Sequence, residues 1–172
     1  MRFVLLLLLL GIAGGCAPVA PRPVPGVAPR PAVPVVALPP PPAPDWRDRS
    51  ATPGTWTYAR DARGSVALFG RPGADALAVL RCDAANRRLF LSRAGGLATP
   101  FTVRTTSITR QLPTGLTGGV PPYAAAVLPA ADPLLDAMAF SRGRWALEQA
   151  GAAPLYLSAW AEPARVIEDC RG

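Results

Sequence analysis

The sequence contains neither lysine nor histidine, and all eighteen of its basic residues are arginine. Without a primary amine or an imidazole on any side chain, a Schiff-base lysine, a Ser-His or Cys-His nucleophile and a histidine metal ligand are excluded. Only carboxylates and tyrosine would remain for acid–base catalysis. The sequence therefore predicts no catalytic residue, no metal and no cofactor, and it favours a protein that is not an enzyme.

Acidic residues are also few, with eleven against the eighteen arginines and a formal charge of +7. Arg2, Arg22 and Arg30 precede residue 45, so residues 45–172 keep fifteen arginines, all eleven acids and a charge of about +4. A surplus this small and scattered differs from the clustered basic face that nucleic acid requires. We therefore expect no nucleic-acid partner.

One hydrophobic run opens the chain, at residues 4–10, and it is too short to span a membrane. Arg2 precedes the run, and small residues follow it at positions 13–15, directly before Cys16. A charged start, a short apolar centre and small residues before a cleavage site are typical of a signal peptide. We predict that residues 1–15 are a signal peptide and that the chain is exported.

The small residues before Cys16 resemble the lipobox of bacterial lipoprotein signals, with Ala13 in place of the leucine that the family usually carries. The resemblance implies cleavage before Cys16, fatty acyl chains such as palmitate on its sulfur and amino group, and a lipid anchor in the cell envelope. Because Ala17 rather than aspartate follows, it implies the outer membrane, facing the periplasm. An ordinary cleaved signal peptide, with Cys16 as a bystander, is the alternative.

Proline dominates residues 17–44 together with alanine and valine, and residues 39–42 are four consecutive prolines. Proline lacks an N–H donor and fixes φ, so such a segment favours polyproline II and builds no core. We predict that residues 16–44 are the lipidated cysteine and a stalk that holds the domain away from the membrane. Recognition of the stalk by a proline-binding groove is the alternative.

Residues 45–172 have the length and pattern of one folded domain. Short apolar runs alternate with Gly, Pro, Asp and Asn turns, which predicts antiparallel hairpins. The predicted strands cover residues 55–59, 65–70, 76–82, 88–93, 101–112, 123–128, 144–149 and 154–158. Residues 114–122, rich in Gly and Pro, predict a loop. Asp132 and Pro133 predict the N-cap and first turn of a short helix, and residues 160–170 predict a closing helix.

Three cysteines are present. With Cys16 assigned to lipid, Cys82 and Cys170 remain as an even pair in an oxidising compartment, which favours a disulfide. The predicted fold is therefore mainly β with some α: an antiparallel β-sandwich or curled sheet with a short helix and a C-terminal helix tied by the disulfide. A pair of free thiols or a metal site is the alternative, although no further ligands stand nearby in the sequence.

This order of elements is similar to that of two kinds of small exported bacterial domain, the invasion-associated locus B type and an accessory protein of type VI secretion. The matching parts are the strand with Leu80, Arg81 and Cys82, the strand at residues 88–93, the hairpin at residues 143–157 and the helix at residues 160–170. The similarity implies a fold and carries no site residue with it.

Arg142 and Arg144 flank Gly143 on a predicted turn. Guanidinium groups suit carboxylate and phosphate, so these two arginines, with Arg93 as a third, are the candidate site for an anionic ligand or partner. In an envelope such ligands include peptidoglycan, other anionic glycans and anionic lipid headgroups. A solvated turn whose arginines pair with nearby acids is the alternative.

Three further groups of residues are poor candidates for a site. Asp132 and Asp136 stand four residues apart, as paired acid–base carboxylates do, but Asp132 is explained as a helix cap. Aromatic residues at alternating strand positions suit a sugar-stacking platform, yet such positions more often belong to a core. Residues 105–107 offer hydroxyls with no base beside them.

The predicted anchor, the predicted stalk and the missing catalytic residue types favour a non-catalytic, membrane-anchored accessory module that binds an envelope protein. A binding domain for an anionic glycan or lipid, or an inhibitor of a wall-cleaving hydrolase, is the alternative.

Overall fold

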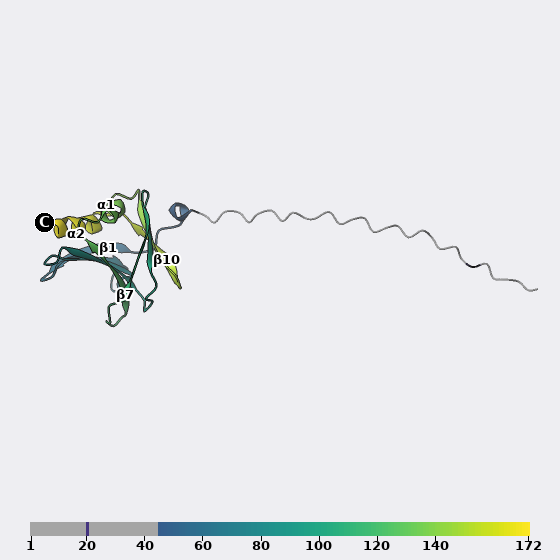
Figure 1. Cartoon of the computed structure of the whole chain (residues 1–172), viewed down its shortest axis with the longest axis horizontal. Helices are drawn as coiled ribbons and strands as arrows, with labels where there is room; N and C mark the ends of the chain where they lie inside the picture. Colours follow the sequence, from purple (N-terminus) through teal and green to yellow (C-terminus); the bar gives the residue numbers. More distant parts are fainter. Residues whose placement is uncertain (1–19, 21–44) are drawn as a thin grey trace, which may run out of the picture. The chain divides into compact units, whose positions relative to one another are not determined.

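The computed structural model describes Ala20 and residues 45–172. The predicted signal peptide and Cys16 lie outside the described residues, as does the predicted stalk apart from Ala20. Within the described residues, two antiparallel sheets, two α-helices and a short 3-10 helix, η1 (Trp46–Asp48), form the domain (Figure 1).

Hydrogen bonding divides the strands into a six-stranded and a four-stranded sheet. The six-stranded sheet runs β1 (Thr55–Asp61), β2 (Gly64–Gly70), β3 (Ala78–Asp83), β4 (Arg88–Ala94), β8 (Tyr123–Pro129) and β7 (Gly115–Leu116). The four-stranded sheet runs β10 (Ala152–Ser158), β9 (Arg144–Gln149), β5 (Phe101–Arg104) and β6 (Thr109–Leu112). All these neighbours pair antiparallel, so the predicted mainly β, antiparallel fold is confirmed.

The core lies between the two sheets and beneath the helices. Along β3, Ala78, Leu80 and Cys82 are buried and alternate with half-buried residues, as expected for a strand with one face turned to the core. The two buried tryptophans, Trp56 and Trp145, stack with ring centroids 6.5 Å apart and join the two sheets. The inward residues of the two sheets therefore form one core.

Helices α1 (Pro133–Ala139) and α2 (Ala161–Arg171) lie on one side of the six-stranded sheet (Figure 1). Asp132 is the predicted N-cap of α1, and its Oδ1 accepts a hydrogen bond from the Leu134 N–H at 2.9 Å. Helix α2 packs on β1 to β4, and its Cys170 forms the predicted disulfide with Cys82 of β3. The expectation of a C-terminal helix tied by a disulfide is thus confirmed.

The single strand predicted over residues 101–112 is wrong, because the chain turns back at residues 105–108 and forms two strands, β5 and β6. The Thr105 hydroxyl accepts a hydrogen bond from the Ile108 N–H at 2.8 Å. It also lies 3.0 Å from the Ile108 carbonyl, to which it donates. A threonine side chain that bonds the nearby backbone offers the chain a turn in place of a continued ladder.

Asp169 of α2 joins that helix to β1. Tyr58 Oη donates to Asp169 Oδ2 at 2.6 Å, and the Arg60 guanidinium donates to Asp169 Oδ1. Partial burial raises the pKa of the Asp169 carboxyl, but the bonds from Tyr58 and Arg60 and the charge of Arg60 outweigh it. The pKa therefore lies below its ordinary value of 3.8.

Replacing Asp169 with asparagine is expected to lower the free energy of unfolding at pH 7 by about 1 kcal/mol, a modest loss because Arg60 is largely exposed. A lowered folded-state pKa stabilises the fold above the unfolded pKa, and that gain is lost as the pH falls through the folded value. Urea unfolding at pH 7 and at about pH 3 measures this loss. An asparagine variant as sensitive to pH as the native chain would contradict the assignment.

Candidate functional site

An apolar groove lies on the face of the six-stranded sheet that is turned away from the core. Its volume is about 710 Å³, within the range of small-molecule and peptide sites. We call it the sheet groove, and its floor consists of Leu68, Val79, Phe90, Ser92 and Ala125. Its rim consists of Arg63, Ala74, Asp75, Ala76, Arg81, Asp83, Thr117 and Tyr123.

The strand register explains why these side chains share one surface. Leu68 stands opposite Val79, and Phe90 stands opposite Val127. The residues that alternate with them along β3 and β4, such as Leu80 and Leu91, are fully buried in the core. An antiparallel sheet with one face on the core usually presents polar side chains on the other, so an apolar outer face is unusual.

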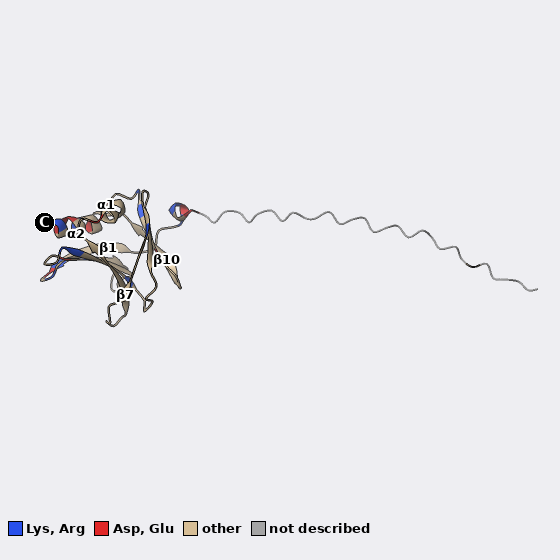
Figure 2. Cartoon of the chain, in the orientation of Figure 1, with Lys and Arg blue, Asp and Glu red and all other residues tan. Residues whose placement is uncertain are grey.

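The apolar surface extends beyond the sheet groove itself. Val127, which is not part of the groove, is 51% exposed and stands opposite Phe90 of the floor, while Leu68 of the floor is 37% exposed. Figure 2 shows the six-stranded sheet coloured mostly as uncharged residues. Contiguous exposed apolar surface of this kind marks a binding site more often than a scattered exposed leucine does.

The rim of the sheet groove carries charges of both signs. Arg81 forms an ion pair with Asp61 at 2.7 Å at the hairpin end of β3, where Arg63 also lies. Asp75 lies in the loop at the other end of β3, and Tyr123 Oη donates to the Ala76 carbonyl at 2.6 Å. Burial, with a smaller contribution from the Asp75 charge, raises the pKa of Tyr123. Charges of both signs are balanced at the hairpin end, where Asp61 and Asp83 accompany the arginines, so the groove suits an apolar segment with a cation at the Asp75 end.

A second cavity, of about 420 Å³, lies on the four-stranded sheet's side of the domain and contains one of the predicted arginines. It is lined by Arg47, Thr106, Ser107 and Arg142. The Arg142 side chain is exposed, and within residues 45–172 its guanidinium forms no ion pair or hydrogen bond. We call these four residues the arginine pocket.

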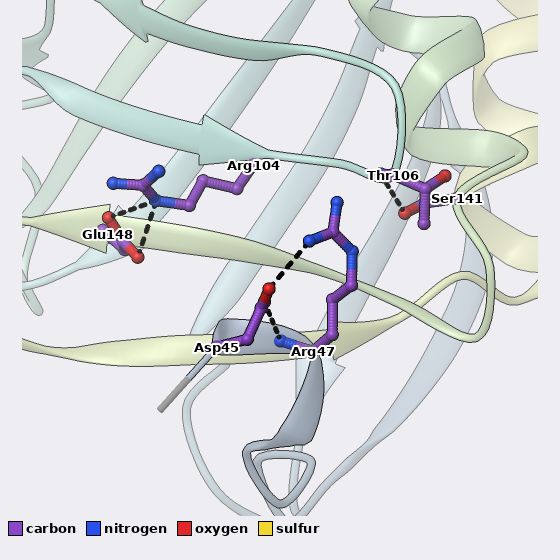
Figure 3. Close-up of polar contacts among 6 residues, drawn as sticks. All are labelled: Asp45, Arg47, Arg104, Thr106, Ser141 and Glu148. Atoms are coloured by element: carbon purple, nitrogen blue, oxygen red, sulfur yellow. Dashed lines mark hydrogen bonds and ion pairs between the residues drawn. The ribbon is translucent and has the colours of Figure 1, made fainter. Parts of the chain in front are cut away.

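Arg144 does not line the arginine pocket, although it stands two residues from Arg142. Its guanidinium donates instead to the Arg49 carbonyl, which fastens the segment after η1 to β9. Arg104 is also engaged, since its Nε lies 3.0 Å from both carboxylate oxygens of Glu148 (Figure 3). The structure therefore separates the two arginines that the predicted turn placed together.

Arg93, the third predicted member, lies in the interior and is only 5% exposed. Its guanidinium donates to the Leu147 carbonyl of β9 at 3.0 Å and to the Ala153 carbonyl of β10. Burial lowers the pKa of this guanidinium, which stays charged at neutral pH. The structure does not bring Arg93 together with Arg142, because Arg93 spans the core to bind backbone carbonyls.

Ala153 lies where the β9–β10 register shifts, between Ala152 and Leu155. A bulge of this kind leaves a residue unpaired in the ladder. Pro154, beside it, has no N–H to donate. Arg93 therefore supplies a hydrogen bond to a carbonyl that the ladder leaves unpaired.

The remaining candidate residues from the sequence have structural roles. Asp132 pairs with Arg110 and Asp136 pairs with Arg171, each at 2.7 Å, so the two carboxylates do not form an acid–base pair. The aromatic platform is also not assembled, because Trp56 and Trp145 are in the core. The Thr105 hydroxyl is hydrogen-bonded to the backbone of Ile108 in the turn between β5 and β6.

The described part of the chain contains no group of three or more His, Cys, Asp or Glu residues that would hold a metal ion. Among the helices of residues 45–172, none is both long enough and apolar enough to cross a membrane.

No protein-family model matches this chain, and neither does any curated protein or solved structure. The interpretation of the sheet groove and the arginine pocket therefore depends on their own geometry and chemistry.

Proposed function

We propose that the chain is a non-catalytic, lipid-anchored envelope protein whose folded domain binds a protein partner through the sheet groove. The observation that carries this proposal is the apolar outer face of the six-stranded sheet, where Leu68, Val79 and Phe90 meet solvent. The lipobox-type sequence before Cys16 and the proline-rich residues that follow it support a tethered position in the envelope.

A protein segment fits this surface better than a small molecule does. The exposed apolar surface continues past the groove to Val127, which a ligand confined to the groove would leave uncovered. The rim is acidic at Asp75, whereas at the opposite end of β3 the charges of Arg63 and Arg81 are balanced by Asp61 and Asp83. We infer a partner segment with apolar side chains and a cation at the end that meets Asp75.

Replacing Phe90 with glutamate is expected to weaken partner binding at least about tenfold, because a buried aromatic contact becomes a desolvated charge. A photo-crosslinking amino acid at Val127 of the full chain, expressed in its own cells, reports the binding. We expect a discrete crosslinked partner that disappears with Phe90→Glu. The fold is expected to persist, since Phe90 faces away from the core.

The matched control is Phe140→Glu, which makes the same substitution at an aromatic residue that is 80% exposed and lies at the end of α1. It should leave the crosslink unchanged. Equal crosslinking by the Phe90 variant and the native chain would exclude the sheet groove as the partner site.

A further inference from the structure

We infer that the arginine pocket is a binding site for a phosphate group. Arg47 and Arg142 supply two guanidinium groups, and Thr106 and Ser107 supply two hydroxyls, around one cavity of about 420 Å³. None of the four lining residues carries a carboxylate. This site lies apart from the sheet groove and shares no residue with it.

Three segments that are far apart in sequence bring these side chains together, and hydrogen bonds hold each segment. Ser141 is buried, and its hydroxyl accepts from the Thr106 N–H at 3.1 Å (Figure 3). The same hydroxyl donates to the Arg144 carbonyl at 2.6 Å, which fixes the turn that carries Arg142. The backbone of the two segments that carry Thr106 and Arg142 is therefore positioned before any ligand binds, which reduces the entropy lost on binding.

Arg47 is held by Asp45 at the start of η1. Asp45 Oδ1 accepts from the Arg47 N–H at 2.9 Å, and its other carboxylate oxygen accepts from the Arg47 guanidinium at 3.0 Å. The backbone bond from Arg47 lowers the pKa of Asp45, and the charges of Arg47 and Arg104 lower it further. A single exposed ion pair contributes little net energy. Because a guanidinium has five N–H donors, Arg47 keeps donors for a stronger anion while it pairs with Asp45.

The donor set matches phosphate chemistry. A phosphate monoester carries a charge between about −1.5 and −2 at pH 7 and three strong acceptor oxygens. Asp45 offsets part of the Arg47 charge, so the two guanidinium groups balance part of the phosphate charge, and their N–H donors together with the two hydroxyls can bind its oxygens. Such a group is present on soluble phosphate esters and, as a diester, in phospholipid headgroups.

The test uses the full chain in micelles of an uncharged detergent, titrated with glycerol phosphate and followed by isothermal titration calorimetry. Native protein is expected to bind saturably, and Arg142→Gln is expected to raise the Kd about tenfold or more. Arg71→Gln is the matched control, since Arg71 is also exposed and has no side-chain partner within residues 45–172. No saturable binding, or equal loss in both variants, would overturn the inference.

A second titration, with glycerophosphoglycerol, distinguishes the two sources of phosphate. Tighter binding of this diester supports a phospholipid headgroup, whereas tighter binding of the monoester supports a soluble phosphate ester. Phe90→Glu should leave both titrations unchanged, and Arg142→Gln should leave the Val127 crosslink unchanged. The titrations therefore test the arginine pocket and the crosslink tests the sheet groove, and either proposal can be contradicted without the other.

Discussion

Replacing Cys82 and Cys170 together with alanine is expected to lower the free energy of unfolding by about 4–5 kcal/mol. The two cysteines are 88 residues apart, so their bond removes much of the conformational freedom of the unfolded chain. Cys170 also lies in the last turn of α2, and the bond holds that turn against β3. Chemical denaturation of the native and double-alanine proteins measures the difference.

The reduced native protein is the control for this prediction. Adding a reductant should move its unfolding midpoint to that of the double-alanine protein, since both then lack the same constraint. Hydrogen exchange should show lost protection first in α2, whose last turn the bond secures. A native protein whose midpoint is the same with and without reductant would contradict the predicted contribution of the disulfide.

Replacing Arg93 with alanine is expected to cost about 3 kcal/mol. The change removes hydrogen bonds to the buried carbonyl of Leu147 and the partly buried carbonyl of Ala153, and it empties the space that the side chain fills between the sheets. Each buried carbonyl left without a partner costs about 1–3 kcal/mol. Relief from burying a charge offsets part of that sum. Urea denaturation measures the loss.

Arg71→Ala is the matched control for Arg93, because Arg71 is exposed and should change stability by no more than about 0.5 kcal/mol. Glycerol phosphate binding by folded Arg93→Ala protein should equal that of the native chain. An Arg93→Ala variant that is as stable as the native chain but binds phosphate more weakly would contradict the structural role. It would indicate that Arg93 takes part in ligand binding.

Local patterns in the sequence were enough to predict most elements of the fold. Short apolar runs between turn residues predicted the antiparallel strands, and Asp132 followed by Pro133 marked the start of α1. The disulfide followed from an even pair of cysteines, Cys82 and Cys170, in a chain whose first residues predict an export signal. These signals depend on residues within a few positions of one another, or on composition alone, and so need no knowledge of strand order.

The candidate sites depend on contacts that no local pattern contains. Arg142 meets Arg47 only because β9 and η1 lie side by side, and the sequence analysis had paired it with Arg144 instead. The sheet groove requires β4 to pair with β8 and so to place Phe90 opposite Val127. One signal was present, however: the uninterrupted apolar residues 66–69 of β2 indicate a strand that is apolar on both faces.

The disulfide also decides where the domain yields to mechanical tension. A pull on the chain before Asp45 enters the fold through β1, an edge strand that pairs only with β2. If the opposing pull acts at Gly172, the covalent path crosses from Cys82 to Cys170 and bypasses every residue between them. Tension would first break the bonds that hold residues 49 and 52 to β9 and β10, and could then draw out the chain as far as Cys82. The residues between Cys82 and Cys170 lie off the covalent path, so the bond sets an upper limit on how far the domain can be extended.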